Sequence, residues 1–154
     1  MKSSVRGYNV GASDYSKHKF QAWDFWLIFG TALNPFDADI VKRILRKKST
    51  DSRMLDYKKI KHICLERIRQ IEENINPYPI KIVETAFPLE KMLDDYDLTY
   101  EDKIMLDRAL IPNEKDRIMD YKEIIMNCDK RIYELKQEKK KEKKGFFARL
   151  FKRK

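Results

Sequence analysis

Glycine and proline are rare in this chain of 154 residues, which holds four glycines and five prolines. Sandwiches and barrels need many tight turns, and these two residues usually supply them, so their scarcity favours long uninterrupted helices. Hydrophobic residues make up 42% of the sequence, enough for a packed core, and charged residues make up 38%. The sequence therefore predicts an all-α fold with a highly charged surface.

Local composition divides the chain into five predicted segments. The aromatic stretch of residues 20–29 predicts a short helix that supplies core side chains, and Gly30 is placed to end it. The segments are a flexible arm (1–17), a three-helix domain (18–75), a proline-containing linker (76–88), a helical hairpin whose second helix is long (89–144) and a basic aromatic tail (145–154).

Helix starts are marked by capping residues. Asn34 precedes Pro35, which suits the first helical position, and predicts a helix to about residue 47. A loop over residues 48–53 and a third helix over 54–74 follow. Thr99 and Asp102 have the spacing of a helix N-cap. The last helix carries a heptad seam of Ile118, Tyr121, Ile125, Cys128, Ile132 and Leu135. This seam either packs on the body or forms a homodimer.

The net charge of +9 is concentrated at one end of the chain. Residues 136–154 hold ten basic and two acidic side chains, so the rest of the chain is nearly neutral. The sequence thus predicts a mildly dipolar body with a basic tail, and not a uniformly basic protein.

A local basic cluster lies in the predicted body. Lys42, Arg43 and Arg46 share one half of a helical wheel, and Arg53 lies at the end of the loop that follows. Guanidinium groups three residues apart can clamp anionic oxygens, which predicts a phosphate site. The alternative is a solvated helix face whose cations favour the C-terminal end of the helix dipole.

A second constellation combines a base, an amide and a carboxylate. His18, Gln21 and Asp24 are spaced three residues apart, so a helix would place them on one face. Together they could orient a nucleobase or a phosphate acceptor. The alternative makes His18 a helix-start residue, Gln21 a surface residue and Asp24 the partner of a buried basic group.

The tail interleaves apolar and cationic side chains. Phe146, Phe147, Leu150 and Phe151 alternate with the cations Arg149, Lys152, Arg153 and Lys154. This composition predicts binding to nucleic acid, to an anionic membrane surface or to an acidic groove on a protein partner. The alternative is a solubilising terminus.

Several classes of site are disfavoured. Cys64 and Cys128 lie far apart and are expected to be free core thiols in a reducing compartment, and the two histidines do not have metal-ligand spacing. No apolar run reaches the roughly 20 residues of a membrane span, and no phosphate loop of the GxxxxGK[ST] type occurs. We therefore name no cofactor, metal ligand or catalytic nucleophile.

Residues 18–68 carry His18, Gln21, Asp24, Asn34, Lys42 and Arg46 in this order. With them, this segment resembles a small phage domain that is mostly of unknown function. Its best-known context is a lytic-phage nucleotide kinase that lacks a Walker motif. The resemblance implies that the functional positions are the matching residues His18, Gln21, Asp24, Asn34, Lys42 and Arg46.

Two hypotheses follow. The first is a phage-encoded nucleotide-phosphate-binding protein of the host-cell cytoplasm. The most specific version of this hypothesis is a protein that resembles a nucleotide kinase in its activity. Phosphates would contact Lys42, Arg43, Arg46 and Arg53, and His18, Gln21, Asp24 and Asn34 would orient the base or acceptor. The second is a non-enzymatic phage adaptor or virion-associated protein that binds its partner through the tail.

Overall fold

A computed structural model describes residues 18–30, 33–46, 49–76, 78–79, 89–113 and 115–152. The predicted arm (1–17), most of the linker (77 and 80–88) and the last two tail residues, Arg153 and Lys154, lie outside them. The described residues form six α-helices and no strand: α1 (Ala22–Phe29), α2 (Pro35–Leu45), α3 (Thr50–Glu72), α4 (Leu89–Leu93), α5 (Tyr100–Leu110) and α6 (Arg117–Phe151). The all-α prediction is confirmed.

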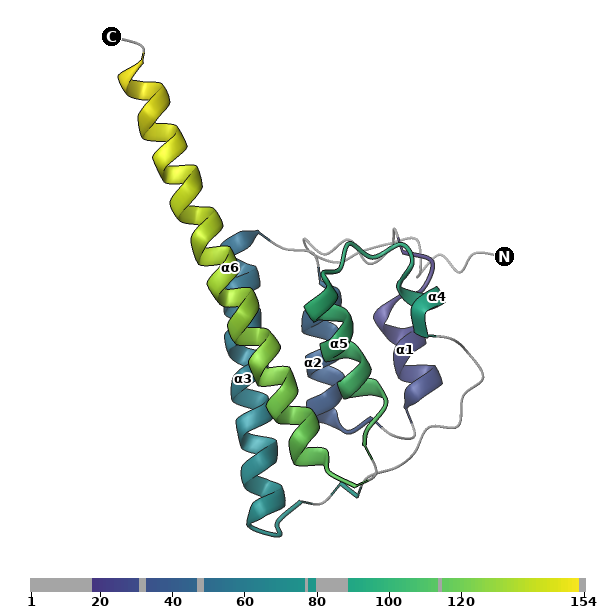
Figure 1. Ribbon diagram of the computed structural model, residues 1–154. Coiled ribbons are helices and arrows are strands. Elements are labelled where there is room, and N and C mark those ends of the chain that lie inside the picture. Colours follow the sequence, from purple (N-terminus) through teal and green to yellow (C-terminus); the bar gives the residue numbers. More distant parts are fainter. Residues whose placement is uncertain are drawn as a thin grey trace.

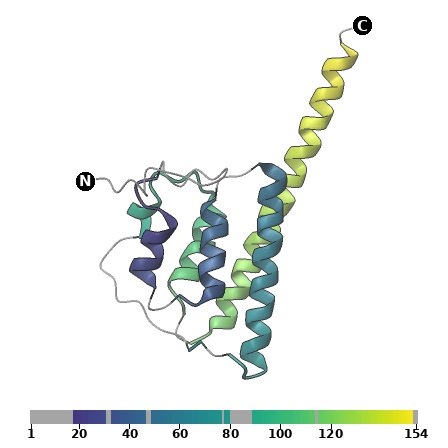
Figure 2. The same cartoon turned by 180° about the vertical axis from the view of Figure 1, so that it is seen from behind.

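The helices form one bundle in which α3 and α6 lie side by side and run in opposite directions (Figure 1). α2 contacts both α3 and α5, and α5 contacts α6, while α1 lies against α2 at the side of the bundle (Figure 2). Buried side chains from all six helices join one hydrophobic cluster. Helices from residues 18–75 and from residues 89–144 therefore share a single core, although the sequence predicts them as separate segments.

Amphipathic faces explain this arrangement. On α2 the buried residues include Ile40, Val41, Ile44 and Leu45, which recur on one side of the helix. On α1 the buried aromatic residues are Phe25 and Phe29, whereas Trp23 is about half exposed. The aromatic stretch thus supplies the core from one side of the helix only.

Two predicted helix starts are confirmed. The Asn34 side chain accepts a hydrogen bond from the Asp37 amide at 2.9 Å, and Pro35 occupies the first turn of α2. At α5, the Thr99 hydroxyl accepts from the Asp102 amide, and the Asp102 carboxylate accepts from the Thr99 amide, both at 3.2 Å. Each cap satisfies amides that have no partner within the helix.

The third helix differs from its prediction at both ends. α3 begins at Thr50 and not at Met54, since the backbone at Ser49 is not helical (ψ 158°) and Asp51 adds an acidic group to the first turn. It ends at Glu72, two residues earlier than predicted. Asn74 adopts a left-handed conformation (φ 56°), and the amide of Ile75 then bonds back to the Gln70 carbonyl at 2.9 Å.

The last helix does not end where the tail was predicted to begin. α6 continues through Gly145 to Phe151. A short isolated helix is unstable because its first turn is costly to form, but α6 is already nucleated by the part that packs on α3 and α5. Only the smaller cost of lengthening the helix remains for residues 140–151, which project past the start of α3 (Figure 1).

Both cysteines are buried and free, as predicted. Burial raises the pKa of the Cys64 and Cys128 thiols well above their ordinary value, so few thiolates form near neutral pH. We expect a disulfide-exchange reagent to label both cysteines only as fast as the protein unfolds. Labelling rates measured across a urea series test this, and rapid labelling of the native protein would contradict the burial of these thiols.

Candidate functional site

The predicted phosphate residues gather at the end of α2 and the start of α3, where they meet a buried carboxylate. Asp56, only 2% exposed, accepts a hydrogen bond from Arg46 Nη2 at 2.7 Å and one from Arg43 Nη1 at 3.2 Å. Arg43 also donates from Nε to Asp39 at 3.0 Å. Lys42 stands on the exposed side of α2. The charges of Arg43 and Arg46 are therefore largely compensated within the fold.

Arg53 has a structural role at the same place. Its Nη1 donates to the carbonyl of Arg43 at 2.9 Å and to that of Arg46 at 3.2 Å, which satisfies acceptors at the end of α2. Its Nη2 lies 3.1 Å from the Asp102 carboxylate, and its guanidinium lies over the ring of Tyr57. Arg53 thus joins α2, α3 and α5.

Tyr57 completes this polar cluster. Its hydroxyl donates to Asp102 Oδ1 at 2.7 Å. Burial, and to a lesser degree the Asp102 carboxylate, raise the pKa of Tyr57 to about 12 against the opposing charge of Arg53. The sequence does not predict that Asp56 and Asp102 pair with Arg43, Arg46 and Arg53. Helix periodicity relates only residues three or four positions apart, and these partners are more distant.

Two of the predicted base-orienting residues, Gln21 and Asp24, cap the start of α1. The Asp24 carboxylate accepts a hydrogen bond from the Gln21 amide at 2.8 Å, in a capping box. The His18 ring stacks on Tyr96, with centroids 3.8 Å apart and planes at 8°, and its Nδ1 lies 3.6 Å from Asp95. His18 thus lies next to the start of the helix, as the structural alternative has it, whereas Gln21 is buried and not at the surface, and Asp24 acts as a capping residue.

Asn34 lies at the opposite end of α2 from Arg43 and Arg46. Besides its capping contact, its Nδ2 donates to the Asp37 carboxylate at 2.8 Å. About twelve residues of helix separate it from Arg46, which corresponds to about 18 Å. The eight predicted residues thus fall into three places and do not line one pocket, so nucleotide binding stays a prediction.

The sequence does not predict a buried ionic network that lies at the other end of the bundle, where α2 and α6 begin. Arg117 donates to the carboxylates of Asp37 and Asp120, each at 2.8 Å, and Asp37 also accepts from the Tyr121 hydroxyl at 2.8 Å. Arg67 donates to the same hydroxyl at 3.2 Å. These two arginines stand on apolar helix faces, which is the one local signal that could have indicated burial. The network ties α2 and α3 to α6.

The distal helix, residues 140–151 of α6, is the part of the candidate site that leaves the body. Lys139 still pairs with Asp51 in the first turn of α3. Beyond it, no hydrogen bond or ion pair joins a described residue of the distal helix to another helix. This segment therefore stands in solvent (Figure 1).

One face of the distal helix is apolar. Its side chains recur at i, i+1, i+4 and i+5, which places them on one side of the helix. They are between 50% and 76% exposed: Phe146, Phe147, Leu150 and Phe151. The two adjacent phenylalanine rings meet edge to face, with centroids 5.9 Å apart. Monomeric proteins rarely expose so many large apolar side chains together without a binding role.

The distal helix is also strongly cationic. The segment holds five basic residues and one acidic residue, and three more basic residues follow it in the sequence. Arg149 and Lys152 lie away from the apolar face by their helical spacing. The structure thus turns the predicted aromatic tail into an amphipathic, cationic helix.

The predicted homodimer would need an apolar stripe on the exposed side of α6. The predicted seam faces the body: Tyr121, Cys128, Ile132 and Leu135 are buried, and Ile118 and Ile125 are partly buried. Met119, Met126 and Tyr133 are exposed at seven-residue intervals. Charged residues stand between them, so this stripe is narrower than a coiled-coil seam. A homodimer stays a prediction.

Comparisons of the whole chain with protein-family models, with curated proteins and with solved structures give no match. The resemblance to the phage domain therefore stays a prediction. Among the described helices, none combines the length and apolar character that crossing a bilayer requires. Within the same residues, no three His, Cys, Asp or Glu side chains gather closely enough to hold a metal ion.

Proposed function

We propose that this protein is a non-enzymatic adaptor that attaches its helical bundle to an anionic membrane surface through the distal helix. The observation that carries the proposal is the exposed face of Phe146, Phe147, Leu150 and Phe151 on a helix that is otherwise cationic. Stable attachment to a membrane usually needs two signals, such as apolar insertion and a polybasic patch. The distal helix supplies both.

Approximate energies support this combination. Burying a large apolar side chain is worth about 1.5–3 kcal/mol when it was fully exposed, and each cation near an anionic membrane adds about 1 kcal/mol. The four apolar side chains retain at least half of their exposure in the free protein, so most of that gain is still to be made. Neither contribution alone would hold the protein firmly.

The chemistry favours a membrane over nucleic acid. Cations alone would bind a phosphate backbone, and stacking on single-stranded bases uses aromatic side chains set in a groove. Here three phenylalanines and a leucine cover one side of a projecting helix, which is the arrangement of an interfacial helix. An acidic groove on a phage protein is the other partner that this helix could serve.

The position of the apolar face sets the orientation of binding. Phe146 follows Lys139 by seven residues, so both lie on the same side of α6, and Lys139 faces α3 through its pair with Asp51. A membrane lying flat along that face would meet the end of the bundle. The distal helix therefore enters the surface obliquely, tip first, with the start of α3 facing the membrane.

Co-sedimentation with vesicles tests the proposal. We expect the protein to bind phosphatidylglycerol vesicles, to bind phosphatidylcholine vesicles much more weakly, and to lose affinity as salt is added. The double substitution Phe146→Ser and Leu150→Ser keeps every charge and should weaken binding at least tenfold, because it removes apolar insertion.

A matched control uses Leu65→Ser together with Met126→Ser, which removes two comparably exposed apolar side chains from α3 and from the packed part of α6. This control should bind as the wild type does. Vesicle binding that survives the distal substitutions unchanged would contradict the proposal. Tighter binding to single-stranded DNA than to anionic vesicles at equal salt would replace the membrane by nucleic acid.

A further inference from the structure

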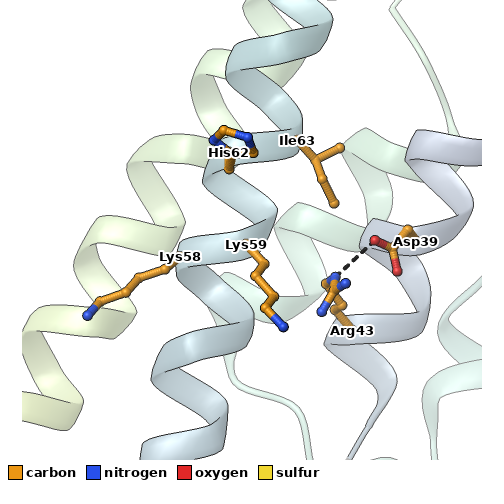
Figure 3. Close-up of a pocket in the computed structure, with 6 residues that line it drawn as sticks. All are labelled: Asp39, Arg43, Lys58, Lys59, His62 and Ile63. Carbon is orange, nitrogen blue, oxygen red and sulfur yellow. Dashed lines mark hydrogen bonds and ion pairs between the residues drawn. The ribbon is translucent and has the colours of Figure 1, made fainter.

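A shallow pocket lies between α2 and α3, away from the distal helix. Its volume is about 300 Å³, and it opens to solvent. Figure 3 shows the lining residues, two from α2 and four from α3: Asp39, Arg43, Lys58, Lys59, His62 and Ile63. Of the residues that the sequence assigned to phosphate, Arg43 is the one that lines it.

We propose that this pocket binds a phosphate group between Arg43 and Lys59. Figure 3 shows the Lys59 side chain extending from α3 toward the Arg43 guanidinium on α2, whereas Lys58 extends to the other side. Two cations that converge across an open pocket repel each other, and an anion between them removes this repulsion. The proposal does not rest on membrane binding.

Arg43 is held in place for this role. Its Nε is fixed by Asp39 and its Nη1 by Asp56, at 3.0 and 3.2 Å, while its Nη2 makes no hydrogen bond with a described residue. The side chain is 18% exposed, so that group can reach a ligand in the pocket. An arginine fixed in this way loses little entropy on binding a phosphate oxygen.

The balance of charge in the pocket favours an anion. Within the part of the chain that the structure describes, Lys58 and Lys59 form no ion pair, and both are exposed. Lys58 and Lys59 therefore add two positive charges at the pocket beside Arg43, whose own charge Asp39 and Asp56 largely compensate. Since Asp39 already pairs with Arg43, a phosphate group has to share that guanidinium with it.

This competition gives the pocket a distinctive test. Lys59→Gln should weaken binding of pyrophosphate by about fivefold, the effect of losing one exposed cation–anion contact, and Lys58→Gln should weaken it less. Asp39→Asn should instead strengthen binding, because it removes the competing carboxylate. Lys103→Gln, an exposed lysine on α5, serves as the matched control and should leave binding unchanged.

Binding is measured with the full chain by calorimetry, and the site is located by amide chemical shifts on α2 and α3. The probes are pyrophosphate, ADP and adenosine. Equal affinity for pyrophosphate and ADP would assign the site to phosphate alone, and tighter binding of ADP would extend it to nucleotides. The proposal would be overturned if neither pyrophosphate nor ADP binds. It would also be overturned if their affinities do not change in Lys59→Gln and Asp39→Asn.

Discussion

Replacing Arg117 with alanine is expected to lower the free energy of unfolding by about 3–5 kcal/mol, the usual cost of breaking a buried ion pair from one side. The Arg117 side chain is 5% exposed, and its two carboxylate partners, Asp37 and Asp120, are equally buried. Without the guanidinium both carboxylates stay inside the bundle with less compensation. Tyr121 and Asn34 still donate to Asp37, but neither carries a positive charge.

Urea denaturation of the wild type and of Arg117→Ala measures this loss. Arg69→Ala is the matched control, since Arg69 also pairs with two carboxylates, Glu66 and Glu73, but on the exposed surface of α3. Surface pairs contribute about 1 kcal/mol or less, so the control should remain close to the wild type. Equal effects of the two substitutions would show that the buried network does not stabilise the bundle.

Alkaline pH is expected to destabilise the protein through Tyr57. The folded protein raises the pKa of this phenol from 10.0 to about 12. Between these values the unfolded chain loses the proton while the folded protein keeps it, so stability falls as the pH rises. A pKa difference of this size corresponds to about 3 kcal/mol in the free energy of unfolding. This stabilisation is complete below pH 10 and is lost as the pH rises through the pKa of Tyr57 in the folded protein.

The free energy of unfolding, measured by urea denaturation at several pH values above 9, tests this expectation. Tyr57→Phe removes the titrating group and should make the decline shallower, at a cost of about 1 kcal/mol at neutral pH for the lost hydrogen bond to Asp102. Some decline should remain, because burial also raises the pKa of Tyr121 and of the Cys64 and Cys128 thiols. Tyr133→Phe, at an exposed position, should keep the wild-type slope, and an unchanged slope in Tyr57→Phe would refute the assignment.

Features encoded within a few residues were predicted well. Asn34, Pro35 and Thr99 mark helix starts because a cap depends on contacts between neighbours in the sequence. The seam of α6 predicted its buried face for the same reason, since residues three and four apart share a side of a helix. These local rules fixed the helices but not the partner of each helix.

The candidate site was less predictable, because identical local patterns serve different purposes. Gln21 and Asp24 have the spacing of a recognition face and also of a capping box, and the latter is what they form. Arg46 and Arg53 looked free to bind phosphate, but Asp56 and Asp102 hold them within the fold. Which cations remain for a ligand depends on contacts between residues far apart in the sequence.

The sequence by itself determined that the chain is helical, where most helices start, and that its excess charge lies at the C-terminal end. The tertiary structure decided two further points. It neutralised the arginines of α2, which leaves Lys59 facing Arg43 across a pocket, and it made the charged end a helix continuous with α6. The physical reason is that helix periodicity and capping are local, whereas charge compensation and helix nucleation by a packed neighbour depend on distant residues.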